Sequence, residues 1–179
     1  MSAARPSPAV ASRLTATDPT VVTAQLGRPP RGLRAVAHRC RCGLPDVVET
    51  APRLPDGTPF PTFYYLTCPR ARSAVGRLES GGLMQEMTTR LATDAELATA
   101  YRQAQADYLR RRDAVEALPD SPSAGGMPDR VKCLHVLVAH ELAAPGSNPF
   151  GREALDRLAG PGQQDWAWET APPCVPGPA

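Results

Sequence analysis

The sequence predicts an α+β fold, in which a small N-terminal antiparallel sheet of about three strands packs with four to six helices. Short segments with alternating or aromatic residues, separated by turn residues, occupy the first third of the chain. Apolar residues spaced three and four apart follow over most of the rest. Because the strands precede the helices and do not alternate with them, an α+β arrangement is favoured over a parallel sheet of βαβ units.

Three segments have the character of strands. Residues 33–38 alternate in the manner of a strand, residues 47–50 form a second candidate, and residues 63–66 are rich in aromatics. The sequence Pro55-Asp56-Gly57 predicts a turn before the third segment, because Pro presets φ and Gly accepts the left-handed region. Two prolines just before the third segment predict that it enters the sheet at an edge.

Helical periodicity marks the remaining elements. Asp18 with Pro19 after it is a typical helix start, and Gly27 is a typical end. The sequence Thr93-Asp94-Ala95-Glu96 has the spacing of a capping box, which predicts that Thr93 opens the longest helix. Together the patterns predict helices over about 18–26, 70–80, 83–91, 94–118, 128–144 and 152–159.

The chain is predicted to contain one domain, over residues 18–160, because 179 residues fit a single domain. Residues 1–17 are rich in Ala, Ser, Pro and Thr and predict a disordered tail, and residues 161–179 predict a second, proline-rich one. The start lacks the apolar stretch of a signal peptide, and no stretch approaches the ~18 apolar residues of a membrane span. We therefore expect a cytoplasmic protein without a membrane partner.

The charges nearly balance, with 20 Lys and Arg residues against 18 Asp and Glu residues. A strong electrostatic field around the whole protein is therefore excluded. Arginines cluster in two places, but no aromatic residues alternate with them, as they would in a protein that binds single-stranded nucleic acid. We therefore expect solvated surfaces at both places and no nucleic acid partner. The clusters are Arg28, Arg31, Arg34, Arg39 and Arg41, and Arg110, Arg111 and Arg112.

Cysteine and histidine residues supply the first candidate site. The five cysteines are odd in number, and a reducing compartment disfavours disulfides, so metal or thiol chemistry is indicated. His38, Cys40 and Cys42 would share one face of a strand, and the predicted hairpin returns Cys68 toward them. We expect zinc there, with an iron–sulfur cluster as one alternative. Core packing of cysteines without any metal is the other.

A further ligand is expected from the helix predicted over 128–144. This helix carries Cys133, His135 and His140. Side chains on one helix converge at spacings of three or four residues, and none of these pairs has such a spacing. The helix is therefore expected to contribute one ligand, Cys133.

The second candidate site would bind a phosphorylated ligand. Gly125 and Gly126 lead into the predicted start of the same helix, where free N–H groups and the helix dipole favour an anion. Asp129 opposes an anion there, so a tight loop without a ligand is the alternative. The residues expected at this site are Ser123, Gly125, Gly126, Arg130, Lys132 and His140, and a satisfied helix-end histidine is the alternative for the last.

No catalytic set follows from the spacing of residues. The G-x-S-x-G, P-loop and H-E-x-x-H motifs are absent, so the sequence leaves open whether the protein is an enzyme. We expect a metal-binding protein whose site is structural or catalytic. One alternative is an enzyme or sensor that binds a phosphorylated small molecule. The other is an interaction protein with a protein partner in cell division or the envelope.

Four segments carry a further signal: residues 25–28 (QLGR), 38–40 (HRC), 51–69 (APRLPDGTPFPTFYYLTCP) and 123–140 (SAGGMPDRVKCLHVLVAH). They resemble an actinobacterial family, the domain-of-unknown-function family 501, over about residues 20–158. The resemblance implies no established activity. Genes of the family lie near those for enolase, a septum-formation protein and an exopolyphosphatase-like enzyme. That neighbourhood implies an intracellular role, with phosphate chemistry or cell division as its theme.

Overall fold

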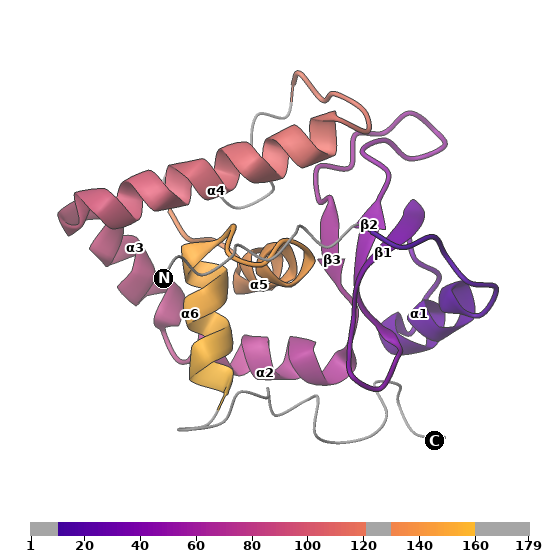
Figure 1. Cartoon of the computed structure of the whole chain (residues 1–179), viewed down its shortest axis with the longest axis horizontal. Helices are drawn as coiled ribbons and strands as arrows, with labels where there is room; N and C mark the ends of the chain where they lie inside the picture. Colours follow the sequence, from indigo (N-terminus) through magenta and orange to yellow (C-terminus); the bar gives the residue numbers. More distant parts are fainter. Residues whose placement is uncertain (1–10, 121–129, 160–179) are drawn as a thin grey trace, which may run out of the picture.

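The computed structural model of the chain describes residues 11–120 and 130–159. Within these residues it contains one three-stranded antiparallel sheet on the N-terminal side and six helices (Figure 1). The predicted α+β fold is confirmed.

The sheet has the strand order β1-β2-β3, with β1 at Leu33–Arg39, β2 at Pro45–Thr50 and β3 at Tyr64–Leu66. Each strand overlaps one of the predicted segments. Gly43 adopts a φ of 82° in the turn between β1 and β2, a conformation that favours glycine. The tight turn lets the two longest strands pair along most of their length.

β1 carries an irregularity near its start. Leu33 pairs with Thr50 and Ala35 pairs with Glu49, so two steps along β1 match one step along β2. Arg34 is therefore the extra residue of a β-bulge. Bulges re-aim side chains, and the side chain of Arg34 reaches the carboxylate of Glu49 on the neighbouring strand.

A different helix packs on each face of the sheet. Helix α1 (Asp18–Leu26) packs against β2, and helix α5 (Leu134–Ala143) contacts all three strands. Figure 1 shows the sheet lying between these two helices. Eight of the ten residues of α5 are buried, as expected of a helix that is apolar on nearly every side.

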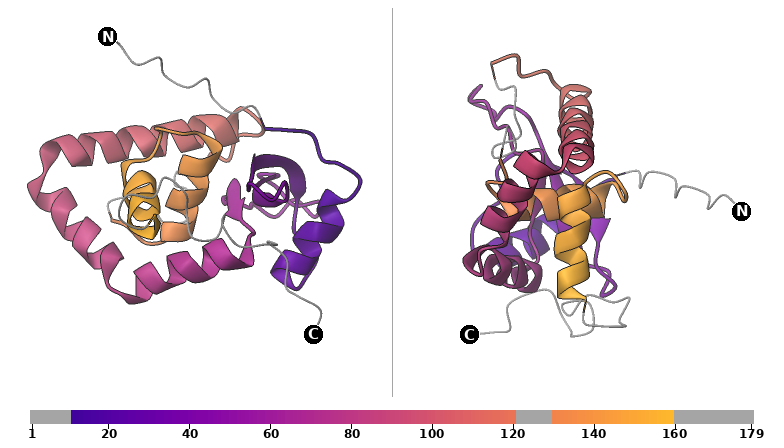
Figure 2. Two further views of the ribbon diagram at one scale, coloured as in Figure 1. Left: turned by 60° about the horizontal axis from the view of Figure 1, so that its bottom comes forward. Right: turned by 90° about the vertical axis from the view of Figure 1, so that its left-hand side faces the viewer.

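Three consecutive helices enclose α5 and the last helix, α6 (Pro149–Leu158). They are α2 (Pro69–Ser80), α3 (Leu83–Thr93) and α4 (Ala95–Asp113). The left view of Figure 2 shows them running along three sides of α5 and α6, with the sheet closing the fourth side. The core therefore centres on α5, and residues far apart in the sequence meet around it.

Both ends of α4 differ from the prediction. Asp94, and not Thr93, is its N-cap, because the Asp94 carboxylate accepts a hydrogen bond of 2.9 Å from the backbone N–H of Leu97. The helix ends at Asp113, earlier than predicted. As a result Val115 is 37% exposed and does not extend the apolar face of the helix.

The start of α5 also differs from the prediction. Residues 130–133 are not helical, and the helix begins at Leu134; the predicted start at Pro128 lies outside the described residues. Tertiary contacts explain the late start. The Thr88 hydroxyl accepts a hydrogen bond from the N–H of Val131, and the Glu79 carboxylate accepts one from the N–H of Leu134.

Helices α5 and α6 approach closely at Gly151. A Cβ atom built there would lie 2.3 Å from the carbonyl oxygen of Leu137 and 2.8 Å from the Cβ of Glu141. Only glycine leaves room for this contact, so the position sets the spacing between the two helices.

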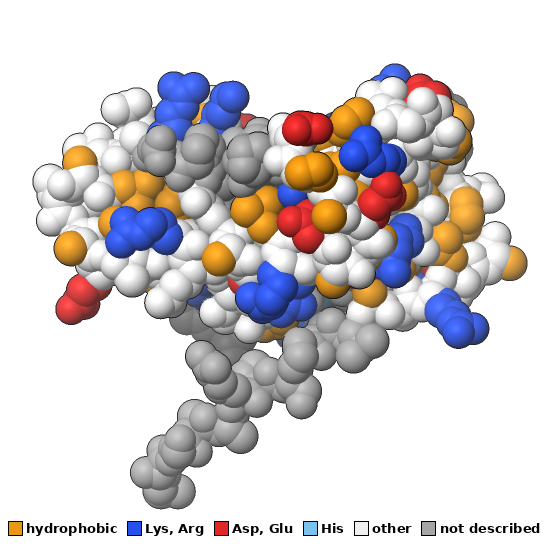
Figure 3. Space-filling view, turned by 90° about the horizontal axis from the view of Figure 1, so that it is seen from above, with side chains coloured by type: hydrophobic (Ala, Val, Ile, Leu, Met, Phe, Trp, Pro, Cys, Tyr) orange, Lys and Arg blue, Asp and Glu red, His pale blue; other side chains and the backbone are white. Residues whose placement is uncertain are grey.

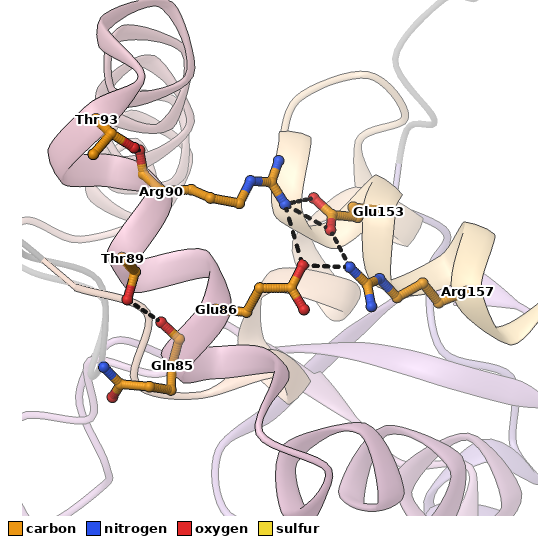
Figure 4. Close-up of polar contacts among 7 residues, drawn as sticks. All are labelled: Gln85, Glu86, Thr89, Arg90, Thr93, Glu153 and Arg157. Atoms are coloured by element: carbon orange, nitrogen blue, oxygen red, sulfur yellow. Dashed lines mark hydrogen bonds and ion pairs between the residues drawn. The ribbon is translucent and has the colours of Figure 1, made fainter.

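Charged side chains join α3 to α6. Figure 4 shows Glu86 and Arg90 of α3 facing Glu153 and Arg157 of α6 across the gap between the helices. The Arg90 Nη1 lies 2.8 Å from Oε1 of Glu153, and the Arg157 Nη2 lies 2.6 Å from Oε1 of Glu86. Exposed pairs of this kind contribute about 1 kcal/mol or less each, so the network orients the helices more than it stabilises them.

Residues 11–17 fall in the segment predicted as a tail, yet they contact the sheet. Ser12 and Val36 exchange backbone hydrogen bonds of 2.8 and 3.0 Å. Asp18 accepts a hydrogen bond from the N–H of Thr15 and pairs with Arg39, whose guanidinium lowers the pKa of Asp18 to about 2. The other residues assigned to tails, 1–10 and 161–179, lie outside the described residues together with residue 160.

The described helices include none that is both long enough and apolar enough to cross a membrane. On the face seen in Figure 3, Lys and Arg side chains are spread out, with Asp, Glu and hydrophobic side chains between them.

Candidate functional site

The candidate site is a pocket of about 360 Å³ between β3, α2 and the start of α5. Leu66 and Val136 contribute apolar lining, and Arg72 lies at the α2 side. Cys133 and His135 contribute the reactive groups. The carboxylate of Glu79 joins them from the end of α2.

Cys133 lies immediately before α5, as its N-cap residue. Its backbone is extended, with φ −155° and ψ 113°, and its side chain makes no capping hydrogen bond. The backbone N–H of Leu134 is instead satisfied by Oε1 of Glu79 at 2.7 Å. The thiol is therefore not used to cap the helix and lies beside the imidazole of His135.

His135 has a partner at each ring nitrogen, and both partners belong to α2. Its Nε2 lies 3.1 Å from the carbonyl oxygen of Arg72, and its Nδ1 lies 3.1 Å from Oε1 of Glu79. A carbonyl oxygen can only accept, so Nε2 carries a proton. Nδ1, which lies beside the Glu79 carboxylate, is consequently the nitrogen that can exchange its proton for a metal ion.

The surroundings of His135 favour its charged form. The hydrogen bond with Cys133 raises the pKa of His135 to about 9; burial opposes this shift, and the Glu79 carboxylate adds to it. The site therefore favours a positive charge on the ring. The same surroundings attract any cation, whether a proton or a metal ion.

The three ligand atoms, from Glu79, Cys133 and His135, all lie within 4.8 Å of one another. In the part of the chain that the structure describes, they form the one group of three or more His, Cys, Asp or Glu side chains with this convergence. Thiolate, imidazole and carboxylate are the ligands that zinc takes in proteins. Ligand atoms around zinc are about 3.3–3.8 Å apart, so a modest side-chain shift would complete the coordination.

Of the residues that the sequence assigned to a metal site, the structure brings only Cys133 into this group. Cys40 is buried, and its Sγ accepts a hydrogen bond of 3.4 Å from the N–H of Cys42, which is exposed. Cys68 is fully buried at the start of α2. The Nδ1 of His38 lies 2.8 Å from Oδ1 of Asp46, on the neighbouring strand.

The residues assigned to a phosphorylated ligand fall into two sets. Ser123, Gly125 and Gly126 lie outside the described residues. Arg130 and Lys132 are exposed and precede α5, and neither lies in a helix.

His140 fits neither predicted site, because it is fully buried and both of its ring nitrogens have polar partners. Its Nε2 lies 3.0 Å from Oδ2 of Asp107, and its Nδ1 lies 3.4 Å from the amide nitrogen of Asn148. Its ring also stacks on Tyr64. These contacts match the alternative of a satisfied helix-end histidine.

Sequence reasoning missed Glu79 and set His135 aside. A helix starting at residue 128 would point Cys133 and His135 in different directions, whereas the extended backbone at Cys133 lets them converge. One signal for Glu79 was present. A carboxylate in the last turn of a helix is unfavourable beside the negative end of the helix dipole. The position of Glu79 in the last turn of α2 therefore indicates a compensating partner outside that helix.

The fold and this cluster define a small α+β protein with three metal-type ligands beside a pocket. The family described as "Protein of unknown function (DUF501)" matches residues 36–156, which is more than half of the chain. The chain therefore belongs to this family, and the match includes Glu79, Cys133 and His135. No curated protein and no solved structure matches the chain.

Proposed function

We propose that the protein binds a divalent transition-metal ion, zinc by its ligand types, through Glu79, Cys133 and His135. One observation carries the proposal. The Arg72 carbonyl accepts the Nε2 proton of His135, which leaves Nδ1, 3.1 Å from the Glu79 carboxylate, as the ligand atom of a group whose three members lie within 4.8 Å of one another. Metal-ligating histidines usually donate their other N–H to a carbonyl or carboxylate in this manner.

Charge supports the same proposal. With Cys133 as thiolate, Glu79 ionised and His135 neutral, the three ligands carry two negative charges, which a Zn²⁺ ion neutralises. In the metal-free protein a proton on His135 takes part of that role, in agreement with the raised pKa of His135. Metal binding would displace this proton, so the affinity for zinc should rise with pH.

Three protein ligands leave a fourth position open. A structural zinc site is usually closed by four ligands, whereas a catalytic one keeps a position for water or substrate. Here the fourth position would face the pocket of about 360 Å³, next to Leu66 and Val136. We therefore favour a metal-dependent enzyme that acts on a small molecule, in which the ion serves as a Lewis acid.

A second candidate function is thiol chemistry at Cys133 without a metal. The observation that favours it is the imidazole of His135, bonded to acceptors at both nitrogens and next to the sulfur atom. A cysteine beside an imidazolium and at a helix N-terminus is the common arrangement of a nucleophilic thiol. A cytoplasmic location, which we also propose, would keep this thiol reduced.

Zinc titration tests the proposal. Protein stripped of metal with EDTA and kept reduced should bind about one zinc ion by equilibrium dialysis. The variants C133S, H135Q and E79Q should each weaken binding about 100-fold or more, because each removes a ligand. The variant C42S is the matched control, since Cys42 is exposed and outside the cluster.

Equal zinc affinity in C133S and the wild type would contradict the metal proposal. If the wild type binds no zinc, alkylation decides the second candidate. Iodoacetamide should then modify Cys133 faster than Cys42, and H135Q should remove the difference.

A further inference from the structure

A second pocket, of about 320 Å³, lies between the sheet and the C-terminal end of α4. Figure 1 shows this end of α4 above the strands. Four polar side chains line it, and they come from all three strands and from α4. They are Arg34, Glu49, Tyr64 and Arg111.

The polar side chains that line the pocket include two guanidinium groups and a carboxylate. The bulge at the start of β1 directs Arg34 onto Glu49, with 2.5 Å between Nη1 and Oε2. Glu49 is buried, and burial raises the pKa of its carboxyl group although Arg34 and Arg111 both oppose the shift. Arg111 is therefore close enough for its charge to act on Glu49.

Arg111 is held in place by two partners. Its Nε lies 2.6 Å from Oδ2 of Asp107, and it also shares a hydrogen bond with the hydroxyl of Tyr64. Asp107 is in turn bound by Arg110 and His140. Because each guanidinium carries five N–H donors, Arg34 and Arg111 keep donors beyond these contacts with the described residues.

The remaining walls are apolar. Phe63, which is buried, and Val115, which is exposed just after the end of α4, both line the pocket. Alanine side chains complete the lining. Nothing in these walls would hold a second polar group, so they suit a small hydrocarbon body.

We propose that this pocket binds a small organic carboxylate, with its head group between Arg34 and Arg111 and its body against Phe63 and Val115. Charge selects a monoanion, because the three guanidinium groups of Arg34, Arg110 and Arg111 and the two carboxylates of Glu49 and Asp107 leave one net positive charge. A phosphate dianion would be repelled more strongly by Glu49. Guanidinium groups bind carboxylates through paired, charge-assisted hydrogen bonds.

Benzoate is a suitable probe, with benzamide as its neutral counterpart of the same shape. Isothermal titration at pH 7.5 should give saturable binding of benzoate, and binding of benzamide at least about tenfold weaker, because it lacks the charge. Inorganic phosphate should also bind more weakly than benzoate. Equal binding of benzoate and benzamide, or no saturable binding of benzoate, would overturn the proposal.

Three variants make the test specific to the residues. R34Q should weaken benzoate binding about tenfold, since Gln can still donate to Glu49 but carries no charge. E49Q should tighten it, because the competing carboxylate is gone. V115W should block the pocket from an exposed position, outside any helix, where a larger side chain leaves the fold intact.

The matched control is R102Q, which removes an exposed arginine in the first half of α4 that does not line the pocket. It should bind benzoate as the wild type does. If V115W leaves the affinity unchanged, or if E49Q weakens binding as much as R34Q does, the carboxylate is not bound in this pocket.

Discussion

At the scale of single residues, His135 connects the chemistry of the site to the rest of the fold. Both of its partners, the Arg72 carbonyl and the Glu79 carboxylate, lie on α2, seven residues apart and therefore on one face of that helix. The ring is consequently held by two acceptors whose positions relative to each other are fixed by helix geometry. Cys133 reaches the same ring from the extended backbone before α5.

This arrangement predicts a pH dependence of stability in the metal-free protein. The folded-state pKa of His135, about 9, exceeds the ordinary value of 6.5, so folding favours the imidazolium. The stabilisation of the folded state by this imidazolium is fully present below about pH 6.5 and is lost as the pH rises through about 9. We expect the free energy of unfolding, measured in urea with EDTA present, to fall by about 1–3 kcal/mol across this range.

The variant H135Q provides the control for this prediction, because Gln can still donate a hydrogen bond to the Arg72 carbonyl but does not titrate. Its stability should change much less between pH 6.5 and 9. An equal loss of stability in H135Q and the wild type would show that another group is responsible.

At the scale of elements, α5 is the helix around which the molecule is built. It contacts the three strands, α2 and α6, and its N-terminus carries two of the proposed ligands. Its distance from α6 depends on Gly151, where the Leu137 carbonyl occupies the space that a side chain would need.

A matched pair of glycine substitutions tests this role. G151A should lower the free energy of unfolding by about 1–3 kcal/mol, because the added methyl group forces α5 and α6 apart. G76A lies within α2 and has nothing within 4 Å of the added Cβ, so it should raise stability by about 0.5–1 kcal/mol. Denaturant unfolding of both variants measures the difference. A tolerated G151A would mean that the helices adjust without cost.

At the scale of the whole molecule, local patterns were enough to predict the fold class and the three strands. Alternation, turn residues and helical periodicity act over fewer than about twenty residues, and each element of the sheet follows from them. The start of α5 did not follow, because contacts from Thr88 and Glu79 in other helices determine it. Tertiary contacts of this kind leave no periodic trace in the sequence.

The candidate site was predictable only in part for the same reason. Cys133 was recognised as a ligand type, but its partner Glu79 is 54 positions away on a helix that faces inward only in the folded chain. Cys40 and Cys68 matched the expected chemistry equally well, yet the structure buries them in the core. Residue types identified the candidates, and the packing around α5 decided which of them meet.

We expect zinc to bind through one sulfur ligand and two ligands of the nitrogen and oxygen type. X-ray absorption at the zinc edge of the loaded protein tests it most directly. The spectrum should show a single sulfur at about 2.3 Å, with nitrogen and oxygen neighbours at about 2.0–2.2 Å. A shell of three or four sulfur atoms would instead place the metal among Cys40, Cys42 and Cys68, and would contradict the site at Glu79, Cys133 and His135.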